Sequence, residues 1–227
     1  MTAQHNTQLI PQDINPRQAV DILKKGNFRF VNNLKINRDL LEQVNETKYG
    51  QWPFAAILSC MDSRTSAELI FDLGLGDIFS IRIAGNIVSE GILGSLEYAT
   101  AVVGSRLIVV LGHTGCGAVK GACDNVQMGN ITTVLDKIQS SVRMEDKITE
   151  NRTSSNAGFV DAVAKLNVHN SVQKILEQSS IIKQLTEEGK VGIMPAMYDV
   201  ATGRVTFFEN DAIINVVPHE EAAVATT

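Results

Sequence analysis

The sequence predicts an α/β protein with a mostly parallel central sheet flanked by helices, an antiparallel edge strand and an N-terminal helical extension. Four short runs rich in Ile, Val and Leu show the two-sided apolar pattern of buried parallel strands, at 54–59, 78–83, 106–111 and 190–197. Segments with helical periodicity separate these runs. Such alternation is typical of a parallel sheet whose right-handed crossovers place helices on both faces.

The first fifty residues form the extension. Residues 15–33, with Pro16 near their start, carry apolar side chains at helical spacing and predict an amphipathic helix. Residues 34–50 are either looped or helical. We therefore expect an N-terminal helical extension over residues 1–50 and an α/β domain over 51–227, with a single domain overall.

Helical patterns fill the spaces between the strands and complete the predicted order. They cover 66–71, 92–103, 117 into the 130s, and 170–188. In the last of these, Asn170 is expected to cap the helix and Gly189 to end it. The run 203–209 follows a short turn-like segment, which favours an antiparallel edge strand, and the polar stretch 145–157 is expected to be a surface loop.

Composition excludes several classes of function. The chain has 227 residues, of which 44% are hydrophobic, and a net charge of −5 without a basic run, so neither a nucleic acid nor a membrane is expected as a partner. Residues 1–14 lack the apolar core of a secretory signal, and no apolar run approaches the roughly 20 residues of a membrane span, which predicts a cytoplasmic protein. Three cysteines do not form a disulfide framework in so long a chain and point instead to metal binding or catalysis.

Two short motifs carry the chemistry. Cys60-Met61-Asp62-Ser63-Arg64 follows one predicted strand, and His113-Thr114-Gly115-Cys116 follows another, 53 positions later. Because ligand sites form at the carboxyl ends of parallel strands, both motifs are expected to meet at one edge of the sheet. Two thiolates and one imidazole are a ligand set suited to Zn²⁺.

The ligand count indicates a catalytic rather than a structural metal. Three protein ligands, Cys60, His113 and Cys116, leave a fourth position for water, or for Asp62 as a reversible ligand. Asp62 and Arg64 lie two residues apart and can form a charge-assisted bidentate pair. Held by Arg64, Asp62 would orient the nucleophile; released, it could bind the metal and close the site.

These residues resemble the β-class carbonic anhydrases, whose hallmark is Cys-x-Asp-x-Arg followed about fifty residues later by His-x-x-Cys. The resemblance is close over 51–122 and weaker as far as 209. It implies a zinc lyase that hydrates CO₂ reversibly to bicarbonate and a proton through attack by zinc hydroxide, with Asp62 and Arg64 as the catalytic dyad. It also implies a homodimer or a dimer-based tetramer, with each pocket at the dimer interface.

Further positions match the plant-like subgroup of that family. Gln51, Phe79 and Tyr98 correspond to substrate-pocket positions, and Gly117 would present its backbone N–H to the pocket. A subgroup with a closed zinc site has Trp and Gly where this chain has Ile57 and Ser59. The resemblance therefore implies the open, water-bound form.

The same residues allow three other functional interpretations. Gly115-x-Gly117 follows a strand and opens a helix, as in a nucleotide-binding fingerprint, but Lys120 occupies the position of the third glycine. A non-catalytic zinc-binding protein would show the same ligands without hydration activity. A hydrolase of a related cumulene such as carbon disulfide would also share them.

Overall fold

The computed structural model describes residues 14–215 and confirms the predicted fold class. A five-stranded sheet with the order β2-β1-β3-β4-β5 forms its centre. Four strands are parallel, and β5 pairs with β4 in the antiparallel direction, as expected for the edge strand. The strands are β1 (Ala55–Ser59), β2 (Ile78–Arg82), β3 (Leu107–His113), β4 (Gly192–Tyr198) and β5 (Val205–Phe207).

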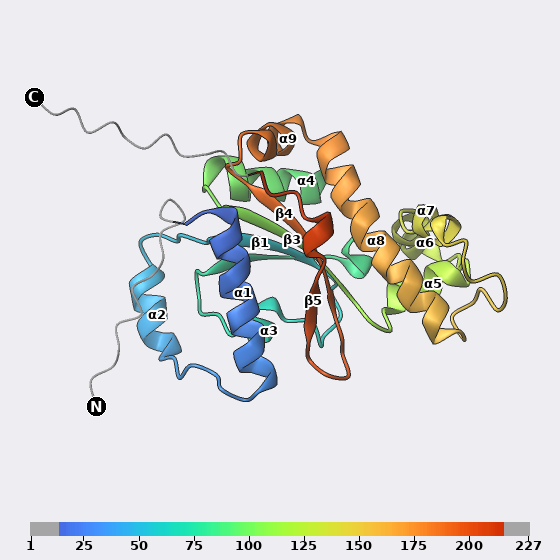
Figure 1. Cartoon of the computed structure of the whole chain (residues 1–227), viewed down its shortest axis with the longest axis horizontal. Coiled ribbons are helices and arrows are strands. Elements are labelled where there is room, and N and C mark those ends of the chain that lie inside the picture. Colours follow the sequence, from blue (N-terminus) through green and yellow to red (C-terminus); the bar gives the residue numbers. More distant parts are fainter. Residues whose placement is uncertain (1–13, 216–227) are drawn as a thin grey trace, which may run out of the picture.

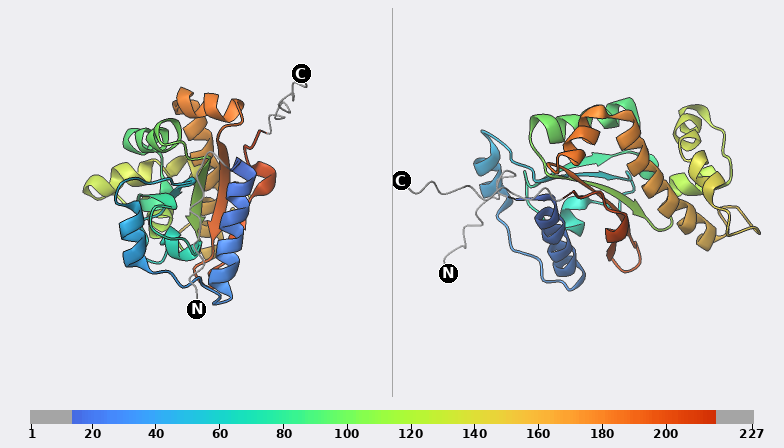
Figure 2. Two further views of the ribbon diagram at one scale, coloured as in Figure 1. Left: turned by 90° about the vertical axis from the view of Figure 1, so that its left-hand side faces the viewer. Right: turned by 45° about the horizontal axis from the view of Figure 1, so that its top comes forward.

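Helices surround this sheet on both faces (Figure 1). In Figures 1 and 2, helices α5, α6 and α7 gather beyond one end of the sheet, beside one end of the long helix α8. Among residues 14–215, the structure contains no helix with both the length and the apolar character that a membrane span requires. The helices are α1 (Pro16–Val31), α2 (Leu40–Thr47), α3 (Ala67–Ile70), α4 (Glu90–Glu97), α5 (Gly117–Cys123), α6 (Gly129–Asp136), α7 (Gln139–Met144), α8 (Ala157–Gln178) and α9 (Ser180–Glu187), with 3₁₀ turns at η2 (Ala84–Asn86) and η4 (Glu209–Asp211) and a π-helical turn at η3 (Tyr98–Val102).

The sheet separates two apolar cores, because successive side chains of a strand point to opposite faces. Leu58 and Val110 belong to the core that α4, α5, α8 and α9 cover, whereas Ile57 and Val109 belong to the core beneath α1 and α3. β1, β3 and β4 are buried along their whole length. This burial on both faces explains why these strands read as continuous apolar runs rather than as alternating ones.

Strand register brings the two motifs to one edge. Ser59 pairs with Leu111 on one side and with Arg82 on the other, so Cys60 leaves β1 beside the end of β3. β3 continues two residues further, to His113. The parallel direction of the strands therefore brings together residues that are 53 positions apart in the sequence.

The prediction for the last long helix was wrong in its start. The structure has α8 from Ala157 to Gln178 and a separate α9 from Ser180 to Glu187, instead of one helix over 170–188. Asn156 caps α8, because its side chain accepts a hydrogen bond from the backbone N–H of Phe159, and Ser179 caps α9 in the same way. Asn170 lies inside α8 and donates its side-chain hydrogen bonds to Ser140 and Ser141 instead.

Two other helical predictions needed smaller corrections. The helix expected from residue 117 into the 130s is divided into α5 and α6, with Asn125 in the left-handed region between them. The helix expected over 92–103 begins at Glu90 and ends in the π-helical turn η3. Residues 34–50, for which the sequence allows either a loop or a helix, contain α2.

A buried ion-pair cluster fastens the N-terminal segment to the domain. Asp72, at the end of α3, has only 4% of its side chain exposed. Its carboxylate accepts hydrogen bonds from Arg29 of α1 and from Arg38, and from the backbone N–H of Ile36. Burial alone would raise the pKa of Asp72, but these donors outweigh burial and hold that pKa below its ordinary value.

We predict that Asp72→Asn lowers the free energy of unfolding by roughly 3 kcal/mol at neutral pH, because two guanidinium groups lose their buried counter-charge. The folded-state pKa of Asp72 lies below the unfolded value of about 3.9, so the wild-type pair stabilises the protein above about pH 4 and this contribution is lost as the pH falls further. Chemical denaturation at several pH values measures both effects. Asp21→Asn, the same change at an exposed position of α1, is the control, and equal losses in the two variants would contradict the prediction.

Candidate metal centre

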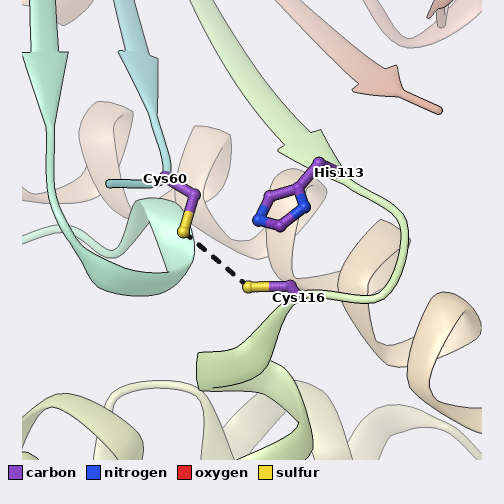
Figure 3. Close-up of side chains that lie close together, drawn as sticks. All are labelled: Cys60, His113 and Cys116. Carbon is purple, nitrogen blue, oxygen red and sulfur yellow. Dashed lines mark hydrogen bonds between the residues drawn. The ribbon is translucent and has the colours of Figure 1, made fainter. Parts of the chain in front are cut away.

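Cys60, His113 and Cys116 converge into one buried cluster (Figure 3). Their potential ligand atoms all lie within 4.8 Å of one another. The two sulfurs are 3.9 Å apart, close to the ~3.8 Å that two Zn–S bonds of about 2.3 Å make at a tetrahedral angle. Cys60 follows β1, His113 ends β3, and Cys116 immediately precedes α5. The geometry and the donor set both fit a zinc ion.

A hydrogen bond at Nδ1 of His113 orients the imidazole so that Nε2 can bind a metal. His113 Nδ1 lies 3.0 Å from the carbonyl oxygen of Thr114, which can only accept, so Nδ1 carries the proton. Nε2 is buried and has no hydrogen-bond partner among the described residues. A buried ring nitrogen without a partner is costly unless it has a ligand, and a metal ion would supply one.

The two thiols influence each other through the contact between their sulfurs. This contact lowers the pKa of Cys60, and the ring of His113 and the backbone N–H of Gly85 act in the same direction. The same contact, together with burial, raises the pKa of Cys116. Cys60 is therefore the sulfur that ionises first, and a metal bound by both sulfurs would replace the protons of the two thiols.

Backbone contacts fix the loop that follows Cys60. Thr65 Oγ1 and Arg82 Nε both lie within hydrogen-bond distance of the carbonyl oxygen of Cys60, at 2.9 and 3.2 Å. Arg82 Nη2 also donates to the carbonyl oxygen of Asp62, at 2.6 Å. Sequence reasoning missed Arg82, because a charged residue at the end of a strand has no motif of its own; its position opposite Ser59 could have indicated it.

Asp62 and Arg64 form the expected bidentate pair. Arg64 Nε and Nη2 donate to the two carboxylate oxygens of Asp62 at 2.9 and 2.8 Å, and the backbone N–H of Arg64 adds a third bond at 3.0 Å. These bonds from Arg64 hold the pKa of Asp62 well below its usual range, so the carboxylate stays ionised. Asp62 is not part of the cluster of ligand atoms found among residues 14–215.

The other predicted site residues lie outside the cluster of metal ligands. Phe79 and Tyr98 contact each other edge to face, with ring centroids 6.3 Å apart, and line an open cavity of about 430 Å³ between β2 and α4. Phe79 pairs in register with Ala56, four residues before Cys60. Gln51 is exposed and precedes β1, at the opposite end of that strand from the cluster. Gly117 is the exposed first residue of α5, directly after Cys116.

Comparison with known proteins agrees with this site. A family model described as carbonic anhydrase matches residues 55–205. Carbonic anhydrase 2 of Mycobacterium tuberculosis is 35% identical over 84% of this chain and 91% of that protein, and a carbonic anhydrase of Mycolicibacterium smegmatis is 34% identical over 84% and 92%.

Solved structures give the same result for the fold. A tetrameric β-carbonic anhydrase from Sordaria macrospora superimposes with a TM-score of 0.63 at 25% identity, covering 74% of this chain and 89% of that one. The β-carbonic anhydrase of Coccomyxa, solved with acetazolamide, has a TM-score of 0.65 at 21% identity over 85% and 82% of the two chains, and shows the shared fold alone. With the ligand cluster at the ends of β1 and β3, these matches place the chain in the β-class carbonic anhydrase family.

Proposed function

We propose that the protein is a zinc lyase that catalyses the reversible hydration of CO₂ to bicarbonate and a proton. The observation that carries this proposal is the buried cluster of two thiols and an imidazole whose Nε2 has no partner, next to a carboxylate held by an arginine. Cys60, His113 and Cys116 would hold the zinc ion. When bound, zinc supplies Lewis acidity, which lets a water molecule lose a proton at moderate pH.

Asp62 would orient the attacking water. Its Oδ1 accepts two hydrogen bonds from Arg64 and its Oδ2 accepts one, so Oδ2 keeps a free lone pair. Because the carboxylate stays ionised, Oδ2 can only accept a hydrogen bond. By accepting one from the water, it would direct a lone pair of the water oxygen at the carbon of CO₂. Arg64 acts through Asp62, because it fixes the orientation of the carboxylate that holds the water.

Stopped-flow measurement of CO₂ hydration on zinc-quantified protein tests the proposal. We expect turnover that depends on the zinc content. Release of hydrogen sulfide from carbon disulfide, without hydration of CO₂, would instead favour the cumulene hydrolase. Zinc binding without either activity would indicate a non-catalytic zinc protein.

We further propose that Asp62 stays on Arg64 in the resting enzyme, so that the site is open. The support is that both carboxylate oxygens of Asp62 are already hydrogen-bonded to Arg64. In Arg64→Ala the freed carboxylate would compete for the open position on the metal, and this competition weakens as the hydroxide concentration rises. We therefore predict that Arg64→Ala loses activity, and loses most at low pH.

A pH series of CO₂ hydration rates checks this prediction. Arg64→Lys keeps the charge but cannot form the two parallel bonds, so it should recover only part of the activity. An Arg64→Ala enzyme with the wild-type rate at every pH would contradict the role of the pair.

We include a homodimer in the proposal, because within one chain the predicted pocket residues Gln51, Phe79 and Tyr98 lie away from the metal ligands. Phe79 lies four register positions, or about 13 Å of strand, before the level of Cys60. Tyr98 is 52% exposed beside the free edge of β2, and Gly91 and Gly94 leave open space there. A second copy packed against this face would bring its Gln51, Phe79 and Tyr98 toward the metal ligands of the first; a dimer-based tetramer would repeat this contact.

We expect Gln51→Ala, like Cys60→Ser, to lose activity, and complementation between these two inactive chains tests the shared pocket. In a mixed dimer of Cys60→Ser and Gln51→Ala chains, one of the two pockets combines wild-type metal ligands with a wild-type Gln51. Statistical assembly of the two co-expressed chains should then restore about a quarter of the wild-type activity. If each pocket were built within one chain, co-expression would restore none.

We also propose a cytoplasmic location. The two sulfurs lie 3.9 Å apart and both must remain reduced to bind a metal. A reducing compartment protects such a pair from forming a disulfide.

A further inference from the structure

Helix α8 carries three polar side chains that bond to the loops around the site. Asn167 and Ser171 are almost fully buried, at 1% and 3% exposure, within a helix whose other buried side chains are mainly apolar. Asp161, one and a half turns earlier, is half-buried. Asn167 and Ser171 donate to, and Asp161 accepts from, the backbone of loops that carry or contact metal ligands.

The first connection runs from Asn167 to Cys60. Asn167 Nδ2 donates to the carbonyl oxygen of Gly85 at 2.8 Å, and Ser171 donates to the carbonyl oxygen of the next residue, Asn86, at 3.2 Å. Gly85 in turn directs its backbone N–H at the sulfur of Cys60, 3.4 Å away. Gly85 has φ +68°, and a Cβ there would lie 2.6 Å from Ile138 Cδ1, so the turn that presents this N–H favours glycine.

The second connection runs from Asp161 to the other motif. Asp161 Oδ1 accepts a hydrogen bond from the backbone N–H of Gly115 at 3.0 Å. Gly115 lies between His113 and Cys116 and has φ +64°, a left-handed conformation that sets the direction of the short loop between these two ligands. The same bond uses the Gly115 N–H that a nucleotide phosphate would need.

We infer that α8 is a positioning helix for the metal centre, with Asn167 aiming the Gly85 N–H at Cys60 and Asp161 holding the loop from His113 to Cys116. A hydrogen bond to a metal-bound thiolate and a fixed ligand loop both strengthen metal binding, since outer-shell partners orient the ligands and tune their charge. Asn167 and Asp161 contact neither ligand side chain directly. They act through the backbone of Gly85 and Gly115.

Zinc release to a chromophoric chelator, measured on the holoenzyme, tests the inference. In Asn167→Ala we expect release at least about 10-fold faster than in the wild type. The cobalt-substituted variant should also show a shifted thiolate-to-cobalt absorption band, because the N–H bond to the Cys60 sulfur is no longer held in place. The inference rests on the proposed zinc site but not on catalysis, so a protein that binds zinc without hydrating CO₂ would still test it.

Gln173→Ala is the matched control. Gln173 is an exposed amide of the same helix and donates to Glu177 rather than to Gly85. Its removal should leave zinc release within about twofold of the wild type, well below the 10-fold expected of an outer-shell partner. Equal acceleration in both variants would mean that any loosening of α8 weakens the site, and would overturn the inference.

Asp161 gives an independent test that does not depend on the stability of the buried Asn167 variant. Asp161→Asn keeps an oxygen that can accept the Gly115 N–H, so it should release zinc nearly as slowly as the wild type. Asp161→Ala lacks the acceptor and should release zinc faster. Wild-type release rates and cobalt spectra in both Asp161→Ala and Asn167→Ala would overturn the positioning role, as would equal acceleration in the two Asp161 variants.

Discussion

Cys60→Ser is expected to lose bound zinc and nearly all CO₂ hydration. Serine puts a hydroxyl of much higher pKa where the cluster presents the sulfur that ionises first. The loss of zinc affinity should therefore exceed the 10- to 100-fold that is typical of an outer-shell substitution. Equilibrium competition with a chelator measures the affinity, and stopped-flow kinetics measures the activity.

Cys123→Ser is the matched control for that experiment. Cys123 is the third cysteine, half-buried at the end of α5 and outside the ligand cluster, and burial raises its pKa to about 11. This variant should keep both zinc and activity. A Cys60→Ser protein with wild-type zinc affinity would contradict the assignment of the ligand.

Asp62→Asn is expected to lose activity while it keeps its zinc. Asparagine has nearly the same shape, but its amide nitrogen cannot accept, so Oδ2 no longer offers the lone pair proposed to hold the water. Groups that position or transfer a proton contribute typically 10²–10⁴-fold, and we expect kcat/KM to fall by roughly that factor. Zinc content by elemental analysis should remain that of the wild type.

The exposed residue Asp136 supplies the control for the change in charge. Asp136→Asn should leave both zinc content and kcat/KM unchanged. If Asp62→Asn lost its zinc together with its activity, Asp62 would be a metal ligand rather than an orienting group. The pair Cys60→Ser and Asp62→Asn thus separates holding the metal from using it.

Much of the metal centre could be predicted from the sequence, because local rules and topology act together there. Cys60 and His113 end apolar runs, and parallel strands must align those ends. The Asp62–Arg64 pair is equally local, since both residues share one short loop. Such features depend on strand direction and chain proximity, which the sequence pattern contains.

The rest depends on tertiary contacts that leave no local pattern. Asn170 has the residue type of a helix cap, but a side chain that finds hydrogen bonds inside the fold does not need to cap, and Asn156 took that role. Asn167 and Asp161 look like ordinary helix residues until the loops beside α8 are placed. The apolar spacing of Phe159 and Val163 could have indicated the earlier start of α8.

Titration of metal-free protein with zinc, followed by stopped-flow CO₂ hydration at each step, tests whether zinc held by Cys60, His113 and Cys116 is the source of the activity. We expect a rate that rises linearly to one zinc per chain and then stays constant. Hydration by the metal-free protein, or a fully zinc-loaded protein that does not hydrate CO₂, would contradict it.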